Sequence, residues 1–351
     1  MFAQTLSPID RASAGRIGRR RPRRLGRCPI LALLAWLASS APLPGGTPAD
    51  PDAAPSLIVV AGAPGQMEYG SNFVGQARQW EAAARTAGVA CRTIGLEPPG
   101  EAADLDRLKC LLEQEPRNGP AVLWLVLIGH GTFDGQNARF NLRGPDLTAI
   151  ELAQWLQPFH RPLAILNTAS SSGAFLPVLS ATNRVIVTST RSGFEQNYAR
   201  FGSLLAESLR DPESDLDQDG QVSLLETFLS ASHRVADFYQ TSGRLATEHA
   251  LLDDNGDRLG TPADWFRGIR AARNAREGAV PDGHRAHQIH LVPAPAELAL
   301  GPEGRIRRDQ IESDLERLRA SKSTLPEEGY YRQLEVILLE LARLLEGPAS
   351  R

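Results

Sequence analysis

The sequence predicts an α/β protein with an open, mostly parallel central sheet. Strand-like apolar runs alternate with helix-like amphipathic segments between residues 56 and 210, which is the pattern of a parallel sheet covered by helices. Apolar residues make up 42% of the 351 residues, so the chain can bury a sizeable core. In such sheets functional groups collect at the edge where the strands end.

Five apolar segments are expected to form the strands. The run AVLWLVLIG (121–129) is apolar throughout, as a central parallel strand buried on both faces should be. The other expected strands are 56–63, 89–95, 161–169 and 184–190. Helices are expected at 71–86, 102–115, 148–156, 199–210 and 223–239, and a late strand-like segment at 287–293.

The N-terminal segment 1–41 is typical of a secretory signal peptide. Eight arginines lie between Arg11 and Arg27, and the apolar run at 30–41 ends in small residues. This run is short for a membrane span, so we expect cleavage and export to the periplasm or the medium. A surface helix with a basic flank and an uncleaved anchor in the inner membrane are the alternatives. A Pro/Ala/Asp-rich linker follows at 42–55.

Removal of residues 1–41 makes the protein acidic. The whole chain carries 38 basic and 41 acidic residues, and the loss of 8 and 1 of these leaves a net charge of −10. We therefore expect no nucleic-acid partner. Of the three cysteines only Cys91 and Cys110 remain. An oxidising compartment allows them one disulfide, and two free thiols fit equally well.

Two neighbouring strands of the expected sheet end in residues that carry chemistry. The central strand ends in IGHGTFDG, which places His130 between two glycines, and the next strand ends in NTASSSG, with three serines in a row. In a parallel sheet both ends lie on one edge, so a histidine and a hydroxyl cluster can face one cleft. The serines form a nucleophile site, a disabled one, or a polar turn.

These two strand ends resemble the legumain–caspase–gingipain group of cysteine peptidases, most closely its bacterial legumain-like members. In that group one strand ends in His-Gly, and the next in an acidic or small residue followed by Ala, Cys, any residue, Ser and Gly. His130 and Gly131 match the first motif, and 168–173 matches the second with Ser170 in the cysteine position. The resemblance covers 56–260. It implies a caspase-like three-layer sandwich, which we expect to form a domain over 56–295.

The resemblance also implies roles for the residues around these motifs. Gly131 and Ser170 would supply backbone N–H groups to an oxyanion hole, and Ser172 would form a structural turn hydrogen bond. The segment VIVTSTRSGFEQN shapes the primary specificity pocket in relatives. Arg191 and Glu195 are therefore expected to bind substrate.

Serine in place of cysteine changes the expected chemistry. A thiol with a pKa of about 8.5 ionises readily, whereas a serine hydroxyl needs a base that a third group holds in the right tautomer. His130 is the candidate base, and Asp134 is a remote candidate for the orienting carboxylate. We therefore expect an exported, catalytically impaired pseudopeptidase that binds peptides. The alternatives are an active endopeptidase that uses Ser170 and His130, and a calcium-dependent structural or assembly protein.

The segment DLDQDGQVSLLE (215–226) fits the twelve-residue calcium loop position by position. Three aspartates so close together repel one another unless a cation lies among them. The expected Ca²⁺ ligands are Asp215, Asp217, Asp219, Gln221, Ser223 and Glu226. An acidic loop that caps the following helix is the alternative. A second segment, DDNGD (253–257), has a similar order but no closing glutamate, and it fits a turn as well as a ligand set.

The C-terminal region 305–347 is expected to form an antiparallel helical hairpin. Helical periods run through 309–322 and 325–346, with Pro326 near a helix start. The second helix carries an apolar stripe that must be buried, formed by Leu334, Ile337, Leu338, Leu341, Leu344 and Leu345. The stripe packs on the partner helix, or it forms a surface for a second copy or another protein.

Overall fold

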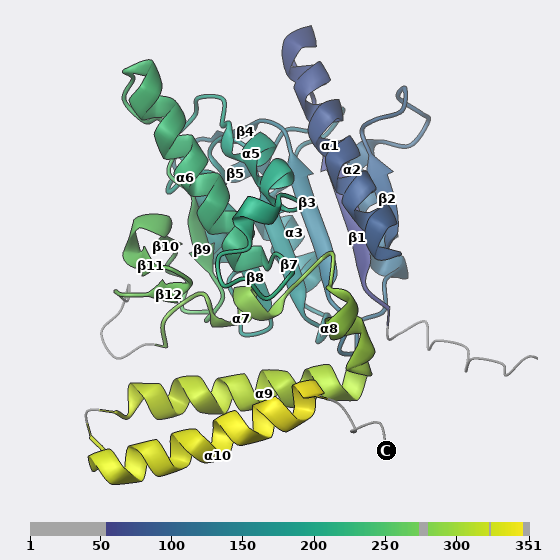
Figure 1. Cartoon of the computed structure of the whole chain (residues 1–351). Coiled ribbons are helices and arrows are strands. Elements are labelled where there is room, and N and C mark those ends of the chain that lie inside the picture. The colour runs from purple at the N-terminus through teal and green to yellow at the C-terminus, as the bar shows by residue number, and fades with distance from the viewer. Residues whose placement is uncertain (1–53, 274–279, 323, 347–351) are drawn as a thin grey trace, which may run out of the picture. The chain divides into compact units, whose positions relative to one another are not determined.

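The fold is built on a seven-stranded sheet of strand order β10-β9-β8-β7-β3-β1-β2 (Figure 1). The computed structural model describes residues 54–273, 280–322 and 324–346. The strands from β2 to β8 in this order pair in parallel, and β9 and β10 add an antiparallel edge. The strands are β1 (Ser56–Ala61), β2 (Ala90–Ile94), β3 (Leu123–Ile128), β7 (Leu163–Asn167), β8 (Arg184–Thr188), β9 (Leu251–Asp253) and β10 (Thr261–Pro262).

Helices cover both faces of this sheet, because successive side chains of a strand point to opposite faces. Along β1, Leu57 and Val59 belong to one apolar core, whereas Ile58 and Val60 belong to the other. The first core is closed by α1 (Met67–Ala87), α5 (Phe201–Ser208) and α6 (Leu224–Ser242), and the second by α2 (Asp104–Gln114), α3 (Ala149–Leu156) and α4 (Leu176–Leu179). The expected α/β class, with a mostly parallel sheet between two helical layers, is confirmed.

Short elements that the sequence pattern did not predict lie between the long ones. A three-stranded antiparallel sheet directly follows β3 and forms part of the candidate site. It consists of β4 (Gly131–Phe133), β5 (Ala138–Phe140) and β6 (Leu147–Thr148). The remaining short elements are η2 (Ser172–Ala174), η3 (Pro212–Ser214), η4 (Ala263–Trp265), β11 (Phe266–Arg267), β12 (Arg270–Ala271) and α8 (Pro295–Ala299).

The expectation of a strand at 287–293 is wrong. The chain there forms the short helix α7 (His284–Gln288), followed by irregular backbone. The carboxylate of Asp254 accepts hydrogen bonds from the N–H groups of Gly283 (3.0 Å) and Ala286 (2.9 Å) at the start of this helix. This cap comes from a distant part of the chain, and it outweighs the alternating pattern that favoured a strand.

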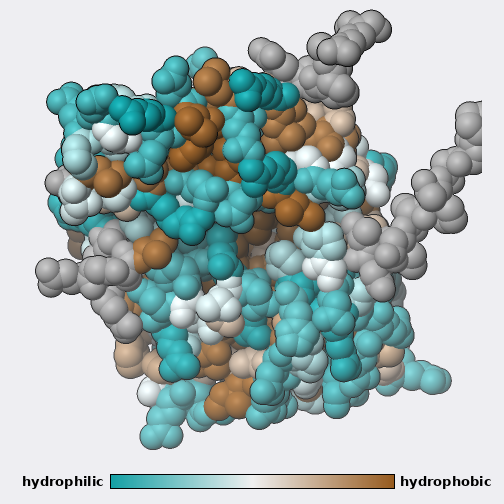
Figure 2. Space-filling view, turned by 90° about the horizontal axis from the view of Figure 1, so that it is seen from below, coloured by the Kyte–Doolittle hydropathy of each residue, from teal (hydrophilic) through white to brown (hydrophobic). Residues whose placement is uncertain are grey.

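The expected C-terminal hairpin is present as α9 (Gly301–Ala320) and α10 (Glu327–Glu346), which pack against each other (Figure 1). Half-buried members of the predicted stripe are Leu334, Ile337, Leu341 and Leu344. Its other members, Leu338 and Leu345, are 45% and 58% exposed. Figure 2 views the molecule from below and shows apolar residues among polar ones on the visible surface. Packing between the helices therefore buries only part of the stripe.

Two sequence expectations concern the chain ends and the cysteines. The expected signal peptide and most of the linker lie outside the described residues. Within 54–273, 280–322 and 324–346, no helix has the length and apolar character that crossing a membrane requires. Cys91 and Cys110 are both free thiols, and Cys110 is exposed on α2.

Candidate functional site

The two predicted strand ends meet through Gly131 and Ser170. β3 and β7 are neighbours in the parallel sheet, so their carboxyl ends lie side by side. The hydroxyl of Ser170 accepts a hydrogen bond from the Gly131 N–H (3.1 Å) and donates one to the Gly131 carbonyl (3.2 Å). Gly131 has to be glycine here, because a Cβ atom would lie 2.3 Å from the Ser170 carbonyl oxygen. Since a hydroxyl has one proton, Ser170 has none left for a base.

His130 lies among aromatic rings at the same edge of the sheet. Its ring centroid is 4.9 Å from that of Tyr69, 5.2 Å from that of Phe73 and 6.3 Å from that of Tyr198. Burial lowers the pKa of His130, and the backbone carbonyl of Pro64 acts in the opposite direction. The imidazole is therefore neutral at neutral pH, as a general base must be. Within the described chain, however, no hydrogen bond joins this ring to Ser170.

Asp134 was a candidate for the carboxylate that orients His130, and this expectation is wrong, because in the described chain its hydrogen bonds go elsewhere. Its carboxylate accepts the N–H groups of Gln136 (2.9 Å) and Asn137 (2.7 Å) in the turn between β4 and β5, and it pairs with Arg139 (3.1 Å). These donors hold the pKa of Asp134 well below its usual range. The carboxylate therefore stabilises its own turn and leaves the imidazole without this orienting partner.

The other two serines of the cluster have different environments. Ser172 is fully buried, and its hydroxyl accepts the N–H groups of Ser189 (3.0 Å) and Thr190 (3.2 Å), which follow β8. It is the structural serine that the resemblance implied. Ser171 adopts a left-handed backbone with φ of 57°, and its buried hydroxyl has no hydrogen-bond partner among the described residues. The next residue has to be glycine, because a Cβ atom at Gly173 would lie 2.3 Å from the Ser192 nitrogen.

Arg191 and Glu195, the expected substrate-binding pair, bind each other. The Nε atom of Arg191 lies 3.1 Å from a carboxylate oxygen of Glu195. The same carboxylate contacts Nδ1 of His249 (2.6 Å) and accepts the His249 N–H (3.2 Å). Arg191 remains 63% exposed at its side chain, and the ring of Phe194 in the same loop is also exposed.

A cavity of about 670 Å³ opens on the α6 side of this loop. Its lining includes Ser189 and His249 but neither His130 nor Ser170, as far as the described residues show. The hollow therefore lies next to the Glu195–His249 contact.

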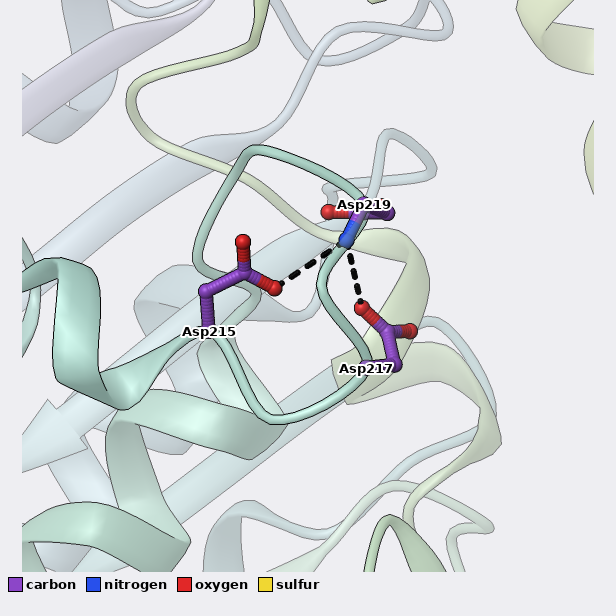
Figure 3. A group of neighbouring side chains, drawn as sticks. All are labelled: Asp215, Asp217 and Asp219. Atoms are coloured by element: carbon purple, nitrogen blue, oxygen red, sulfur yellow. Dashed lines mark hydrogen bonds between the residues drawn. The ribbon is translucent and has the colours of Figure 1, made fainter.

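The predicted calcium loop brings three carboxylates together (Figure 3). One carboxylate oxygen from each of Asp215, Asp217 and Asp219 lies within 4.8 Å of the others. The N–H of Asp219 donates to Asp215 (3.2 Å) and to Asp217 (3.3 Å), as the dashed lines show. Gly220 has a left-handed backbone with φ of 91°, and its N–H donates to the second oxygen of Asp215 at 3.0 Å. The backbone therefore gathers the aspartates around one point.

Glu226, the expected closing ligand, is buried and caps α6. One of its carboxylate oxygens accepts the N–H of Leu216 (2.8 Å), and the other accepts the N–H (2.9 Å) and hydroxyl (2.8 Å) of Ser223. Burial raises the pKa of Glu226 despite these donors. The amide oxygen of the Gln221 side chain accepts the N–H of Ala294 at 3.0 Å. The expected Ca²⁺ ligand of this residue was its backbone carbonyl, which this hydrogen bond does not use. The capping alternative for this loop is thus realised, and a capping glutamate can also bind an ion through its remaining lone pairs.

Sequence reasoning missed the surroundings of His130 and the partner of Glu195. Tyr69 and Phe73 come from α1, about sixty residues before the histidine, and no local pattern connects them with it. No motif in the sequence marks His249, and its contact with Glu195 depends on the pairing of β9 with β8. Only the tertiary fold brings these side chains together.

No protein-family model and no curated protein sequence matches this chain significantly. Among solved structures, the Drosophila initiator caspase Dronc is 10% identical with a TM-score of 0.39, over 59% of this chain and 81% of that one. Caspase-1 from Spodoptera frugiperda is 12% identical with a TM-score of 0.36, over 63% and 96%. Raptor from Chaetomium thermophilum is 12% identical with a TM-score of 0.32, over 46% and 18%. At these scores the likenesses carry no functional argument.

Proposed function

We propose that this chain is an exported, caspase- or legumain-like peptidase homologue that binds peptides at the Ser170 edge of the sheet and cleaves them poorly or not at all. The observation that carries the proposal is the hydroxyl of Ser170, which donates its proton to the Gly131 carbonyl rather than to His130. Export rests on the leader-like composition of 1–41.

The contacts of Ser170 oppose each step of acyl transfer. To attack a carbonyl, the hydroxyl has to leave Gly131 and pass its proton to His130, which is packed against Tyr69 and Phe73 and lacks Asp134 as an orienting carboxylate. Loss of the orienting group alone costs a serine protease about 10⁴-fold in rate. The Gly131 N–H, which would stabilise the oxyanion, is bound to the serine oxygen itself.

The peptide ligand is proposed from exposed groups of the loop 191–195, in which the Glu195 carbonyl accepts the Ser171 N–H at 2.8 Å. Glu195 uses Nε of Arg191, which leaves the terminal nitrogens of this exposed guanidinium for a carboxylate or amide side chain. The ring of Phe194 is 73% exposed and contacts Phe133 edge-on, with centroids 5.2 Å apart. The first peptide to test therefore contains an acidic or amide residue followed by an apolar one.

Fluorescence anisotropy with labelled Asp-, Asn- and Lys-containing peptides tests this function. We expect the aspartyl and asparaginyl peptides to bind the wild type, and Arg191→Leu to weaken their binding at least about 10-fold. Arg258→Leu, which removes an arginine outside this loop, is the matched control. Equal affinity for all three peptides, or rapid cleavage of any of them by the wild type, would rule out the proposal.

Substitution Ser170→Cys provides a second test of the same site. A thiol ionises without a tightly held base, so peptide-based thiol electrophiles should label the variant and leave the wild type unlabelled. Adding His130→Ala should remove most of the labelling. A thiol at position 170 that resists even small, unselective reagents would show that the position, which is 3% exposed in the wild type, is closed to ligands.

We propose calcium binding at 215–226 as a second property of the chain. Its support is the convergence of the Asp215, Asp217 and Asp219 carboxylates on one point, with Glu226 beside them. Oxygen ligands of this number and charge suit Ca²⁺. A bound ion would neutralise the carboxylates and tie the loop to the start of α6.

A further inference from the structure

Helix α10 lies on the side of α9 that faces away from the sheet (Figure 1). The opposite side of α9 is fixed to α7, where the His284 ring forms a hydrogen bond with the Ser313 hydroxyl (2.9 Å) and Gln288 donates to the Asp309 carbonyl (3.1 Å). α9 therefore has neighbours on two sides, whereas α10 packs on α9.

Exposed apolar side chains gather on α10. Of the fifteen large apolar side chains that are exposed in the described chain, five belong to this one helix of 20 residues. They are Tyr331, Val336, Leu338, Leu339 and Leu345, each between 45% and 62% exposed. Such a concentration on a water-soluble surface is typical of an interaction site.

Most of these side chains form a stripe beside the one that faces α9. Tyr331, Leu338 and Leu345 are spaced by seven residues, which is the heptad period of packed helices, and Leu339 and Ala342 border them. We call these five residues the outer seam. Because an α-helix turns by about 100° per residue, the outer seam lies about a quarter turn from the half-buried stripe that faces α9.

Two apolar stripes on one helix call for two neighbouring helices, as in a helical bundle. α9 is the neighbour of the half-buried stripe. Within the described residues, the outer seam stays exposed to solvent. The second neighbour therefore has to come from outside the described chain.

The charges beside the outer seam indicate what this neighbour is. Glu335 and Arg343 lie four residues before and four residues after Leu339. Both side chains are exposed, and within the described chain neither forms an ion pair. By contrast, Arg332 on the same helix pairs with Glu328 (2.7 Å). Opposite charges thus stand at equal distances on the two sides of one leucine.

This arrangement matches a second copy of the same helix. If two copies of α10 pack antiparallel around a two-fold axis at Leu339, Glu335 of each copy meets Arg343 of the other. The same pairing places Tyr331 near Leu345 of the other copy. A two-fold axis requires a surface that complements itself, and opposite charges placed symmetrically about its centre satisfy this requirement.

We propose that the outer seam of α10 is a homodimer interface, in which the C-terminal hairpins of two copies pack antiparallel. The apolar side chains of the seam supply the buried surface, and the two Glu335–Arg343 pairs set the direction and register of the helices. The proposal requires neither a peptide nor calcium, so its failure would leave both of those proposals untouched.

Sedimentation equilibrium of the full-length chain at micromolar concentrations tests the dimer. We expect the wild type to have twice the mass of one chain. Leu338→Glu brings two like charges together beside the axis and should raise the dissociation constant at least about 100-fold. Ile150→Glu introduces the same charge at an apolar side chain of α3 that is 54% exposed. This matched control should remain dimeric.

A charge exchange tests the pairing with a second copy. Glu335→Arg alone places arginines opposite each other at both ends of the seam, and Arg343→Glu alone does the same with glutamates. Each variant should dimerise at least about 10-fold more weakly than the wild type. An equimolar mixture of the two variants should associate again, because Glu and Arg then meet at both ends. Both residues are exposed, so these variants keep the test valid if Leu338→Glu misfolds.

Three results would overturn the proposal. The first is a wild type that stays monomeric at about 100 μM. The second is a dimer that Leu338→Glu leaves intact, because another surface would then hold the copies together. The third is a mixture of the charge variants that associates no more tightly than each variant alone, which would make a different protein or a membrane the occupant of the seam.

Discussion

The three consecutive serines should respond very differently to replacement by alanine. Ser172→Ala removes the acceptor of two buried N–H groups, those of Ser189 and Thr190. Ser170→Ala removes the partner of one N–H and one carbonyl of Gly131. Ser171→Ala removes a buried hydroxyl that has no partner in the described chain.

The magnitudes follow from these contacts. A buried donor that loses its acceptor costs about 1–3 kcal/mol, so the two donors freed by Ser172→Ala should lower the free energy of unfolding by about 2–6 kcal/mol. Ser170→Ala leaves one N–H unpaired and should cost about 1–3 kcal/mol. Ser171→Ala removes an unsatisfied polar group and should change stability by less than about 0.5 kcal/mol or raise it by up to about 1 kcal/mol.

Urea unfolding, followed by tryptophan fluorescence and circular dichroism, measures all three variants. The slope of free energy against urea concentration should stay at the wild-type value, which makes the midpoints comparable. The order of loss should be Ser172→Ala, then Ser170→Ala, then Ser171→Ala. A loss above about 2 kcal/mol for Ser171→Ala, or a change below about 0.5 kcal/mol for Ser172→Ala, would refute these hydrogen-bond assignments.

Three other predictions concern the rest of the chain. Calcium should raise the melting temperature, and Asp219→Asn should remove most of the rise without lowering the calcium-free value; an unchanged curve in millimolar Ca²⁺ would count against the first loop. Burial raises the pKa of Cys91 to about 11, so iodoacetamide at pH 8 should alkylate the exposed Cys110 first, and equal rates would contradict this. Protein exported by the native host should begin near Pro42 by mass spectrometry, whereas soluble cytoplasmic protein with an intact Met1 would argue against export.

The central strands could be predicted because parallel strands buried on both faces are continuous apolar runs, as at 123–128. The short strands β4 to β6, β9 and β10 have two or three residues each, and their pairing depends on distant partners. The segment 287–293 alternates like a strand, but contacts of Asp254, some thirty residues earlier, begin a helix before it. Local pattern therefore failed where a non-local hydrogen bond decided the structure.

The candidate site was predictable in part for the same reason. The order of parallel strands brings Gly131 to Ser170, and the resemblance to the peptidase motif implied a turn hydrogen bond for Ser172. Whether Ser170 points to His130 or to a backbone carbonyl depends on a side-chain torsion, which no sequence pattern specifies. Asp134 was a candidate for the third catalytic group because it is close to His130 in the sequence. Its hydrogen bonds within the turn are not visible from the sequence.

The most direct test of the account asks whether Ser170 can be acylated. Full-length protein is incubated with an activated serine reagent, a fluorophosphonate, and the peptide that contains 168–173 is analysed by mass spectrometry. Because the Ser170 proton is held by the Gly131 carbonyl and His130 makes no hydrogen bond to this hydroxyl in the described chain, we expect no adduct on this residue. Stoichiometric modification of Ser170 that is lost in His130→Ala would contradict the account and establish a working serine peptidase.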